Sequence, residues 1–358
     1  MLVLGIESSC DDTSVALLDC SEQGCFVIKE LTASQIEIHK KYGGVVPEIA
    51  GRMHAEKIVP LIEEVLKDQS HPDIIAVTAG PGLITGLIVG VEAARTLSYA
   101  WNIPLVAVNH IEGHIHSVEI SNSKSQITKI QYPALALVVS GGHTELIHIK
   151  KQGKYKIIGQ TRDDAAGECF DKVAKLLDLP YPGGPQISKL AETGKNNAID
   201  FPRPMLKKEN FSAKSGPAFG WDFSFAGLKT SALYWLRDHT LDSSPKSYKL
   251  KAISSEDFCA SFEQAIVDVL VAKTIRAAQK LKPKTIILAG GVSANKKLRA
   301  TLANQIESLV PHSLFLTPST QYSMDNASMI AVAGYYQALK KDFTSWKKIS
   351  ADPNWSLN

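Results

Sequence analysis

Short β-branched runs alternate with longer stretches of helical periodicity along this chain of 358 residues. The runs predict strands at Leu2–Glu7, Ser14–Asp19, Ile74–Thr78, Leu105–Asn109, Ala134–Ser140, Glu145–Ile149, Lys156–Gly159, Thr285–Ala289 and Leu314–Leu316. The periodic stretches predict helices at Val46–Asp68, Thr85–Trp101, Ala165–Leu177, Ser255–Leu281, Ala294–Glu307 and Asp325–Lys341. This alternation of strands and helices predicts an α/β fold.

A pattern of strand, polar turn and returning strand occurs twice. Near the start, VLGIES returns as TSVALLD, and near the middle, ALALVVS turns at GGHT and returns as ELIHIK. Each hairpin opens a half that continues with strands and helices, which indicates two similar lobes. The Ser/Lys/Gln-rich stretch Ser121–Tyr132 has the composition of a connection between them.

We therefore expect two lobes. The N-terminal lobe comprises residues 1–128 and 325–358, with the C-terminal helix packed back on it. The C-terminal lobe comprises residues 129–324 and includes a helical, basic insertion at about residues 165–250. Within it, Phe201–Lys251 carries nine Lys/Arg, four Asp/Glu and several aromatic residues. Such a mixture indicates either a surface that binds single-stranded nucleic acid or an amphipathic insertion that packs on the lobe.

Length and composition describe an ordinary globular protein. About 100–200 residues per domain gives about two domains, and 44% hydrophobic with 21% charged residues excludes a disordered or fibrous chain. A net charge of +3 is too small to coat nucleic acid by charge alone. The first residues do not resemble a signal peptide, and the most apolar stretch, Leu83–Ala94, is too short to cross a bilayer.

The five cysteines form no CxxC pair and are odd in number. They are Cys10, Cys20, Cys25, Cys169 and Cys259. This usage predicts free thiols in a reducing cytoplasm.

The two polar hairpin turns are candidate phosphate loops. Gly5–Thr13 (GIESSCDDT) and Ser140–Thr144 (SGGHT) can offer backbone N–H groups and hydroxyls to a phosphate. Tight hairpins favour Gly in any case, so one loop alone is weak evidence. Two matching loops indicate the phosphate clamp of actin-like nucleotide-binding folds. In the first loop, Asp11 and Asp12 could position a metal or polarise a reacting group.

Three further glycine-rich segments precede predicted helices or turns. Ile286–Asn295 (IILAGGVSAN) would lie near adenosine in the actin-like class, or Ser293 simply caps the next helix. Gly183 and Gly184 in YPGGP either expose backbone to a ligand or end a helix. The segment TAGPGLITG lacks the GxGxxG spacing, and GxxxxGK[ST] does not occur, which disfavours a dinucleotide fold and excludes a P-loop.

His110 and His114 are spaced to share a metal. Four residues apart in NHIEGH, they lie on one face of a helix that follows a strand. Two ligands are too few, and Asp325, at the start of the last helix, is the candidate third ligand or else the N-cap of that helix. Glu112 lies about 200° around the helix from His110 at about 100° per residue. The general base of an HExxH protease is therefore missing, and His116 and His143 are expected to be structural.

Eleven segments, in order along the whole chain, resemble the TsaD family of tRNA N6-adenosine threonylcarbamoyltransferases. The segments are GIESSCDDTSVALL, GGVVPEIAGRMHAEKI, TAGPGLITGLIVG, NHIEGH, LVVSGGHTELI, GECFDKVAKLL, YPGGP, FPRPM, DFSFAGLKT, LAGGVSANKKLR and SMDNASMIA. The resemblance implies an α/β, actin-like ATPase fold of two similar lobes with a ligand cleft between them. It also implies one divalent metal per subunit, with Fe²⁺ favoured and Zn²⁺ possible, held by His110, His114 and Asp325.

The resemblance further implies which residues hold the substrate threonylcarbamoyl-AMP and the adenine nucleotide in the cleft. They are Val138, Val139, Ser140, Gly141, Gly142, Asp171, Gly184 and Asn295. Two departures from the family stand out, because Asp11-Asp12 replaces Asp-Glu and Ala226 replaces a Ser. The segment Leu206–Trp221 is also longer than is usual in the family.

The activity implied is transfer of threonylcarbamoyl from threonylcarbamoyl-AMP to N6 of the adenine 3′ of the anticodon in tRNA. Asp11 or Asp12 would accept the proton of the attacking amine, and the residues do not decide between them. The implied partners are the tRNA anticodon loop, a TsaB-like paralogue docking near Val46–Leu66, and a TsaE-like ATPase. An actin-fold small-molecule kinase and a non-catalytic assembly subunit are the alternatives.

Overall fold

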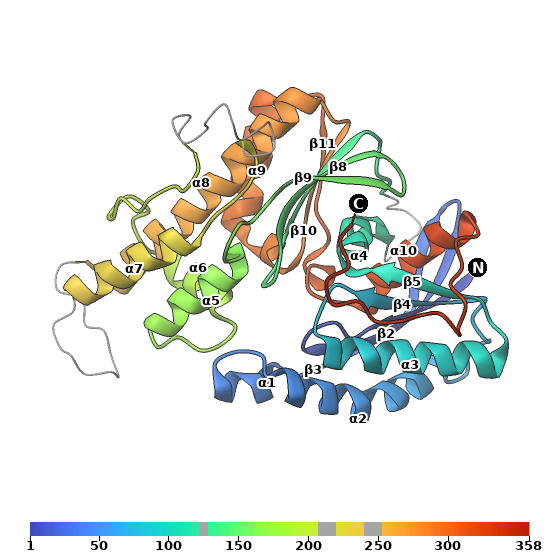
Figure 1. Cartoon of the computed structure of the whole chain (residues 1–358). Helices are drawn as coiled ribbons and strands as arrows, with labels where there is room; N and C mark the ends of the chain where they lie inside the picture. Colours follow the sequence, from blue (N-terminus) through green and yellow to red (C-terminus); the bar gives the residue numbers. More distant parts are fainter. Residues whose placement is uncertain (122–127, 207–219, 240–252, 358) are drawn as a thin grey trace. The chain divides into compact units, whose positions relative to one another are not determined.

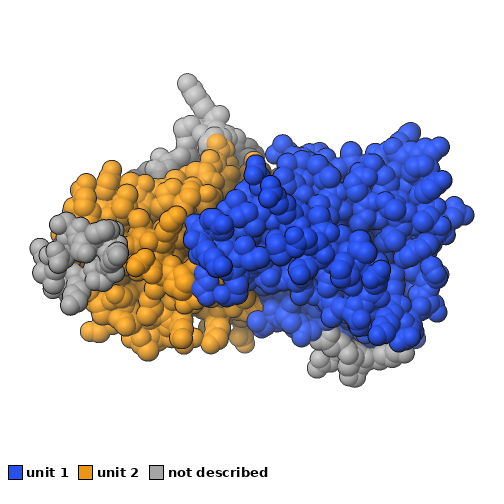
Figure 2. Space-filling model, turned by 90° about the horizontal axis from the view of Figure 1, so that it is seen from below, with its two compact units in different colours: residues 1–131, 318–358 blue, residues 132–317 orange. Residues whose placement is uncertain are grey.

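The chain folds into two compact units that share one sheet topology. The computed structural model describes residues 1–121, 128–206, 220–239 and 253–357. Unit 1 comprises Met1–Gln131 with Pro318–Asn358, and unit 2 comprises Tyr132–Thr317 (Figure 2). Part of the predicted connection and most of the segment Leu206–Trp221 lie outside the described residues.

Unit 1 is a sheet covered by helices on both faces (Figure 1). Its strands are β1 (Leu2–Glu7), β2 (Asp12–Ser21), β3 (Gly24–Ser34), β4 (Ile74–Gly80), β5 (Leu105–Asn109) and β6 (Ile120–Ser121), in the order β5-β4-β1-β2-β3-β6. Its helices are α1 (Ile36–His39), α2 (Pro47–Leu66), α3 (Ile84–Trp101), α4 (His110–His116) and α10 (Ala327–Leu339).

Alternate residues of β1 face the two helical layers of unit 1. Val3 packs in the cluster that contains α10, and Leu4 and Ile6 pack in the cluster that contains α2 and α3. This alternation follows from the two-residue period of a strand. It explains why β1 is a continuous apolar run, which is typical of a strand covered on both faces.

Unit 2 repeats five neighbouring strands of unit 1, all except the edge strand β6. Its strands are β7 (Ala134–Val139), β8 (Thr144–Lys151), β9 (Lys154–Gln160), β10 (Thr285–Ala289) and β11 (Leu314–Leu316), in the order β11-β10-β7-β8-β9. Its helices are α5 (Ala166–Leu176), α6 (Gly183–Ala191), α7 (Ala226–His239), α8 (Ser255–Leu281) and α9 (Lys296–Leu309).

In both units the first strand pairs antiparallel with the second and parallel with the fourth. The pairs are β1–β2 and β1–β4 in unit 1, and β7–β8 and β7–β10 in unit 2. The predicted α/β fold of two similar, actin-like lobes is therefore confirmed. Because the topology repeats, the turn between the first two strands occupies the same place in each unit, after Glu7 in unit 1 and after Val139 in unit 2.

Strand β3 was missing from the predicted strands, and a cysteine prediction failed with it. Lys29 and Glu30 break its apolar pattern, and several of its side chains remain partly exposed. β3 pairs with β2 so that Cys20 lies opposite Cys25, and the two form a disulfide. The expectation that all five cysteines are free thiols was therefore wrong, whereas Cys10, Cys169 and Cys259 are free.

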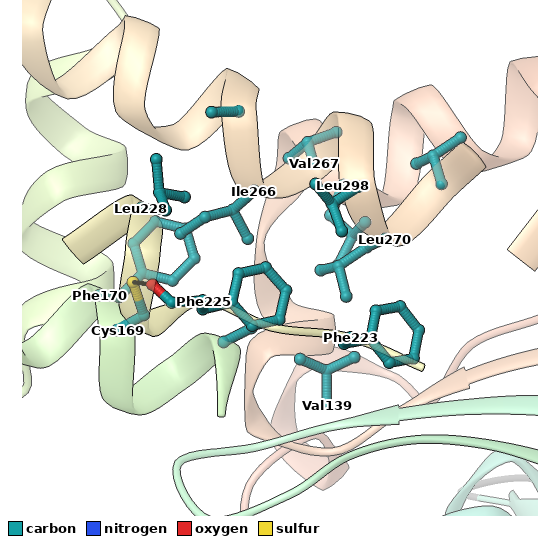
Figure 3. Close-up of a cluster of buried hydrophobic side chains, with 14 of the residues drawn as sticks. Val139, Cys169, Phe170, Phe223, Phe225, Leu228, Ile266, Val267, Leu270 and Leu298 are labelled. Carbon is teal, nitrogen blue, oxygen red and sulfur yellow. Dashed lines mark hydrogen bonds between the residues drawn. The ribbon is translucent and has the colours of Figure 1, made fainter. Parts of the chain in front are cut away.

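The core of unit 2 contains two aromatic residues of the basic segment, Phe223 and Phe225 (Figure 3). Phe223 and Phe225 are fully buried between the sheet and helix α8, and Cys169 Sγ lies 3.6 Å from the Phe225 carbonyl oxygen. Tyr234 on α7 is 52% exposed and lies under Arg237. The packed interpretation of the segment therefore holds for Phe223 and Phe225, while Phe211 and Phe219 lie outside the described residues.

The structure predicts that Phe225 stabilises the fold and that Tyr234 does not. Phe225→Ala should lower the free energy of unfolding by about 3–5 kcal/mol, because it leaves a cavity in a packed core. Tyr234→Ala should change it by less than about 1 kcal/mol, since only an exposed ring and its cation–π contact are lost. Denaturant unfolding followed by circular dichroism measures both, and equal losses would contradict this account of the core.

Candidate functional site

Three potential metal ligands converge in unit 1. His110 and His114 lie on α4, which follows β5 directly, and Asp325 lies two residues before α10. Asp325 Oδ1 is 3.4 Å from His110 Nε2 and 3.2 Å from His114 Nε2. The ligand atoms all lie within 4.8 Å of one another. Ligands bound at about 2.0–2.2 Å in a tetrahedron are separated by about 3.3–3.6 Å, so these distances suit one metal ion.

The hydrogen bonds of His114 also fit a metal. Its ring is fully buried, and neither nitrogen makes a hydrogen bond to any described residue. A buried polar atom without a partner costs free energy, and a metal on Nε2 would remove that cost. Two imidazoles and a carboxylate are a donor set that Zn²⁺ and Fe²⁺ both accept.

Close packing of α10 brings Asp325 to the histidines. A Cβ atom at Gly5 on β1 would lie 2.2 Å from the Ala327 carbonyl oxygen, and one at Gly113 on α4 would lie 2.7 Å from Ile330 Cδ1. Gly5 therefore needs to be glycine for α10 to lie this close, because it meets backbone, whereas at Gly113 the Ile330 side chain would have to move. Asn326, whose Oδ1 accepts from Met329 N–H at 2.9 Å, caps α10. Asp325 is not the cap, and its carboxylate faces the histidines instead.

Glu7 supports His110 from the opposite side. Its carboxylate is completely buried at the end of β1. His110 Nδ1 lies 2.9 Å from Glu7 Oε2, and Thr78 Oγ1 donates to the same oxygen at 2.7 Å. Burial raises the pKa of Glu7, but the charge and hydrogen bond of His110 outweigh it and lower that pKa. Glu7 is therefore an ionised acceptor in the protein interior.

The same electrostatic coupling acts on the ligands themselves. Burial lowers the pKa of His110, but the charges of Glu7 and Asp325 outweigh burial and raise it to about 10. Burial also dominates at His114 and lowers its pKa. Burial raises the pKa of Asp325, while the two histidines outweigh it and hold the pKa well below its usual range. Asp325 is therefore an anionic donor between the two rings.

Asp11 ends the loop that joins β1 to β2 in the same unit, and Asp12 is the first residue of β2. Burial raises the pKa of both carboxyl groups, and the charge of Asp325 raises both further. The pKa of Asp12 reaches about 7, and its buried Oδ1 has no hydrogen-bond partner among the described residues. A carboxylate with a pKa near neutrality is suited to general acid–base chemistry.

His54 on α2 holds this loop in place through two hydrogen bonds. Its Nε2 donates to the Cys10 carbonyl oxygen at 3.0 Å, and its Nδ1 accepts from Thr13 Oγ1 at 2.8 Å. Gly86 and Gly90 on α3 complete the support, because a Cβ on either would collide with Ser8. These two glycines therefore let α3 pack closely against the loop.

Glu7, Thr78 and His54 were not among the residues predicted for this site. A charged residue that ends a buried apolar strand was the available signal for Glu7. Glu112 accepts instead from Gln337 at 2.8 Å, and His116 lies 2.7 Å from Glu119. As predicted from the spacing, α4 brings no protease base to the histidines.

Unit 2 carries a second cluster around its first hairpin turn. Val138 and Val139 are buried at the end of β7, and the turn is closed by hydrogen bonds between Ser140 and His143. Side-chain space is open at Gly141 and Gly142, where a Cβ would meet no described atom within 4 Å. The protein itself therefore does not require glycine at these two positions, whereas a ligand close to the backbone would.

Two neighbouring segments of unit 2 reach this turn. Gly290 has a φ of +86°, and a Cβ there would lie 2.5 Å from the Val139 carbonyl oxygen. Gly167 N–H, in the first turn of α5, donates to the Ser140 carbonyl oxygen at 3.2 Å. The N-terminus of α5, which favours anions, therefore lies against the turn.

The remaining predicted substrate residues hold the first turns of helices α6 and α9. Asp171 on α5 accepts from the N–H groups of Gly183 at 2.7 Å and Gly184 at 3.3 Å, which caps α6. Asn295 caps α9 through Leu298 N–H at 2.7 Å, so the cap is Asn295 rather than Ser293. The Asn295 amide also donates to Ser188 on α6 and Glu263 on α8.

The chain is similar to proteins of one family along most of its length. A family model described as TsaD, tRNA N6-adenosine threonylcarbamoyltransferase, matches residues 26–332. A protein named tRNA N6-adenosine threonylcarbamoyltransferase from Bacillus subtilis (strain 168) is 47% identical over 338 residues, covering 93% of this chain and 90% of that protein. One of the same name from Geobacillus thermodenitrificans (strain NG80-2) is 43% identical, covering 99% and 96%.

Among solved structures, the crystal structure of T. kodakarensis HypF is similar with a TM-score of 0.57 and 13% identity. The similarity covers 95% of this chain and 48% of that one. At this identity the likeness shows the fold alone.

The raised pKa of Asp12 predicts a pH-dependent cost to stability. The ordinary pKa of 3.8 becomes about 7 in the folded protein. At pH values between about 3.8 and 7, the folded state therefore holds a proton that the unfolded state has lost. The free energy of unfolding falls as the pH rises through this range. Asp12→Asn should be more stable than the unchanged protein at pH 8, and the difference should shrink toward pH 4.

Urea unfolding at pH 4, 6 and 8, in buffer with a chelator, measures this dependence. Both proteins retain the histidine cluster, so their difference isolates Asp12. Asp19→Asn, the same substitution at an exposed position of the same strand, is the control against which the pH dependence of Asp12→Asn is compared. A pH-independent difference for Asp12→Asn would contradict the raised pKa.

Proposed function

The chain belongs to the TsaD family of tRNA N6-adenosine threonylcarbamoyltransferases, and we propose that the residues described above carry out that transfer. The enzyme is an acyltransferase that moves threonylcarbamoyl from threonylcarbamoyl-AMP to N6 of the adenine 3′ of the anticodon. Its tRNAs read codons that begin with A. The N6 amine attacks the carbamoyl carbon, the bond to the phosphate oxygen breaks, and AMP leaves. The single observation that carries the assignment to residues is the convergence of His110, His114 and Asp325.

One divalent metal, Fe²⁺ in preference to Zn²⁺, would be held by His110, His114 and Asp325. When bound, it would supply Lewis-acid stabilisation of the charge that develops on the phosphate or carbonyl oxygen. The unpartnered nitrogens of His114 and the spacing of the three ligand atoms support this proposal.

The turn of unit 2 would hold the AMP part of the substrate. Backbone N–H groups at Gly141 and Gly142 would bind the phosphate, with Val138, Val139 and Ser140 shaping the turn. Asp171 holds Gly183 and Gly184 at the start of α6, where Gly184, which has no side chain, would let the nucleoside lie close to the backbone. Asn295 would orient that part through the amide that already joins α6 and α8.

Asp12 would accept the proton that the attacking amine loses, with Asp11 as the alternative. A pKa of about 7 for Asp12 places it close to the value at which a base works best near neutral pH. Asp11 lies in the same loop, and its pKa is raised by burial as well. Much of the remaining acceleration would come from positioning the amine against the anhydride.

The partners proposed are the tRNA anticodon loop, a TsaB-like paralogue and a TsaE-like ATPase, all in the cytoplasm. Among the described residues, no helix combines the length and apolar character that crossing a membrane requires. Helix α2 buries Ile58, Ile62 and Val65, and it packs against α3. Val59 on α2 and Ile84 and Ile88 on α3 remain 42–55% exposed. These exposed apolar side chains support docking of the paralogue on the two helices.

The transferase assay tests the assignment directly. The protein is incubated with partner proteins, threonylcarbamoyl-AMP and unmodified tRNA, and the modified adenosine is measured by mass spectrometry. His110→Ala should lower product formation by about 100-fold or more and should lose the metal, because a ligand is removed. His116→Asn removes a buried histidine of the same helix outside the cluster and should retain both.

Other outcomes of this assay separate the alternatives. Product from both the unchanged protein and His110→Ala would keep the transferase and exclude the proposed role of the metal. Absence of product from every protein, with ATP consumed on a small molecule, would instead favour the kinase. Chelation of the metal should lower the rate of the unchanged protein, and added Fe²⁺ or Zn²⁺ should restore it.

The docking surface is tested by one charge on α3. Ile88→Glu should abolish co-elution with the TsaB-like paralogue in gel filtration, because an apolar contact would become a buried unpaired charge. Thr96→Glu adds the same charge at an exposed position two turns further along α3 and should leave binding unchanged. Equal binding by both variants would place the interface elsewhere.

A further inference from the structure

The buried carboxylate of Glu7 accepts three hydrogen bonds. Ser9 N–H donates to Oε1 at 2.6 Å, while Thr78 Oγ1 and His110 Nδ1 donate to Oε2 at 2.7 and 2.9 Å. The side chain is fully buried. Every one of these partners is a donor, so only an acceptor without hydrogens satisfies them all.

We propose that Glu7 is a positioning residue of the metal site, which sets the ring orientation and the ligating nitrogen of His110. The inference rests on the proposed metal site and adds a residue to it. Because Glu7 only accepts, Nδ1 of His110 keeps its hydrogen, and Nε2 is the nitrogen that can exchange its hydrogen for a metal. That nitrogen is the one 3.4 Å from Asp325 Oδ1. Carboxylates that accept from a ligating histidine in this way strengthen metal binding.

Glu7 also connects the metal ligand to the Asp11–Asp12 loop. The Ser9 N–H that Glu7 accepts belongs to the first turn of that loop, and Ser9 Oγ lies 3.1 Å from His110 Nδ1. The Ser9 carbonyl oxygen accepts from Leu83 N–H at 2.7 Å, which fixes the turn to the start of α3. One carboxylate therefore holds both the imidazole and the beginning of the loop.

A purely structural role for Glu7 is the competing explanation, and the chain contains its own control. His116 and Glu119 form another buried histidine–carboxylate pair, 2.7 Å apart and also in the α4 region. Glu119 accepts in addition from Ile130 N–H and Tyr336 Oη. The His116–Glu119 pair thus resembles the Glu7–His110 pair in burial and in number of hydrogen bonds, but it is not among the clustered ligands.

The experiment is a metal titration of the metal-free full chain. Glu7→Gln places an N–H₂ group among three donors, so at least one of them loses its acceptor or His110 changes orientation. Competition with a chromophoric chelator should show Zn²⁺ affinity 10–100-fold lower, on the order of other outer-shell changes. The Co²⁺ absorption spectrum should also change, because the geometry of His110 changes. Glu119→Gln should alter neither readout.

Wild-type Zn²⁺ affinity and an unchanged Co²⁺ spectrum in Glu7→Gln would overturn the proposal. Equal losses of Zn²⁺ affinity in Glu7→Gln and Glu119→Gln would overturn it as well, since they would show that both variants act by destabilising the fold. His110→Ala tests the metal site separately from the role of Glu7. Unimpaired metal binding by that variant would contradict the proposed metal site itself.

A measurement on the unchanged protein keeps the test independent of whether the variant folds. In ¹⁵N NMR of the Zn²⁺-loaded protein, His110 should carry its hydrogen on Nδ1 and bind the metal through Nε2. Coordination through Nδ1 would show that Glu7 does not set the ligating nitrogen, and would overturn the proposal. Glu7→Asp keeps an acceptor-only carboxylate and should retain more affinity than Glu7→Gln.

Discussion

The functional centre of unit 1 depends on how closely α10 approaches β1 and α4. Asp325 and the two histidines are more than 200 positions apart in the chain, and local structure cannot join them. Gly5 and Gly113 let the first turns of α10 lie directly on the strand and the helix. The apolar residues of α10, such as Met329 and Ile330, are buried in that contact. Hydrophobic burial therefore supplies the free energy that holds Asp325 beside the imidazoles, although burying its charge is costly.

The polar centre is built so that its buried charges compensate one another. Glu7 and Asp325 lie on opposite sides of His110, and each faces a nitrogen of its ring. Three donors satisfy Glu7, whereas His114 is left without a hydrogen bond among the described residues. Glu7 fixes the orientation of the His110 ring. The His114 ring has nitrogens without a hydrogen bond among the described residues, and one of them could bind a metal. Such a distribution is typical of a site shaped for a cation.

Repetition of one topology produced two different chemical environments. Each unit begins with a hairpin whose turn lies at the same place in its sheet. In unit 1 the turn is acidic, and it is held by His54, Ser8 and Glu7. In unit 2 the turn is rich in glycine and open, and it lies against the N-terminus of α5. The first suits proton transfer near a metal and the second suits a phosphate, which agrees with a transferase that acts on a mixed phosphoric anhydride.

The alternation of strands and helices, the repeated hairpins, the histidine pair and the family could all be predicted from the amino-acid sequence. These features depend on local periodicity, on spacing within one helix and on motifs, which involve neighbouring residues. The folded structure was needed to show that β3 pairs Cys20 with Cys25, that Asn326 rather than Asp325 caps α10, and that Phe223 and Phe225 are core residues. It also decided that Glu7 meets His110. Each of these depends on contacts between segments distant in sequence, where packing and hydrogen-bond satisfaction, and not local preference, select the partner.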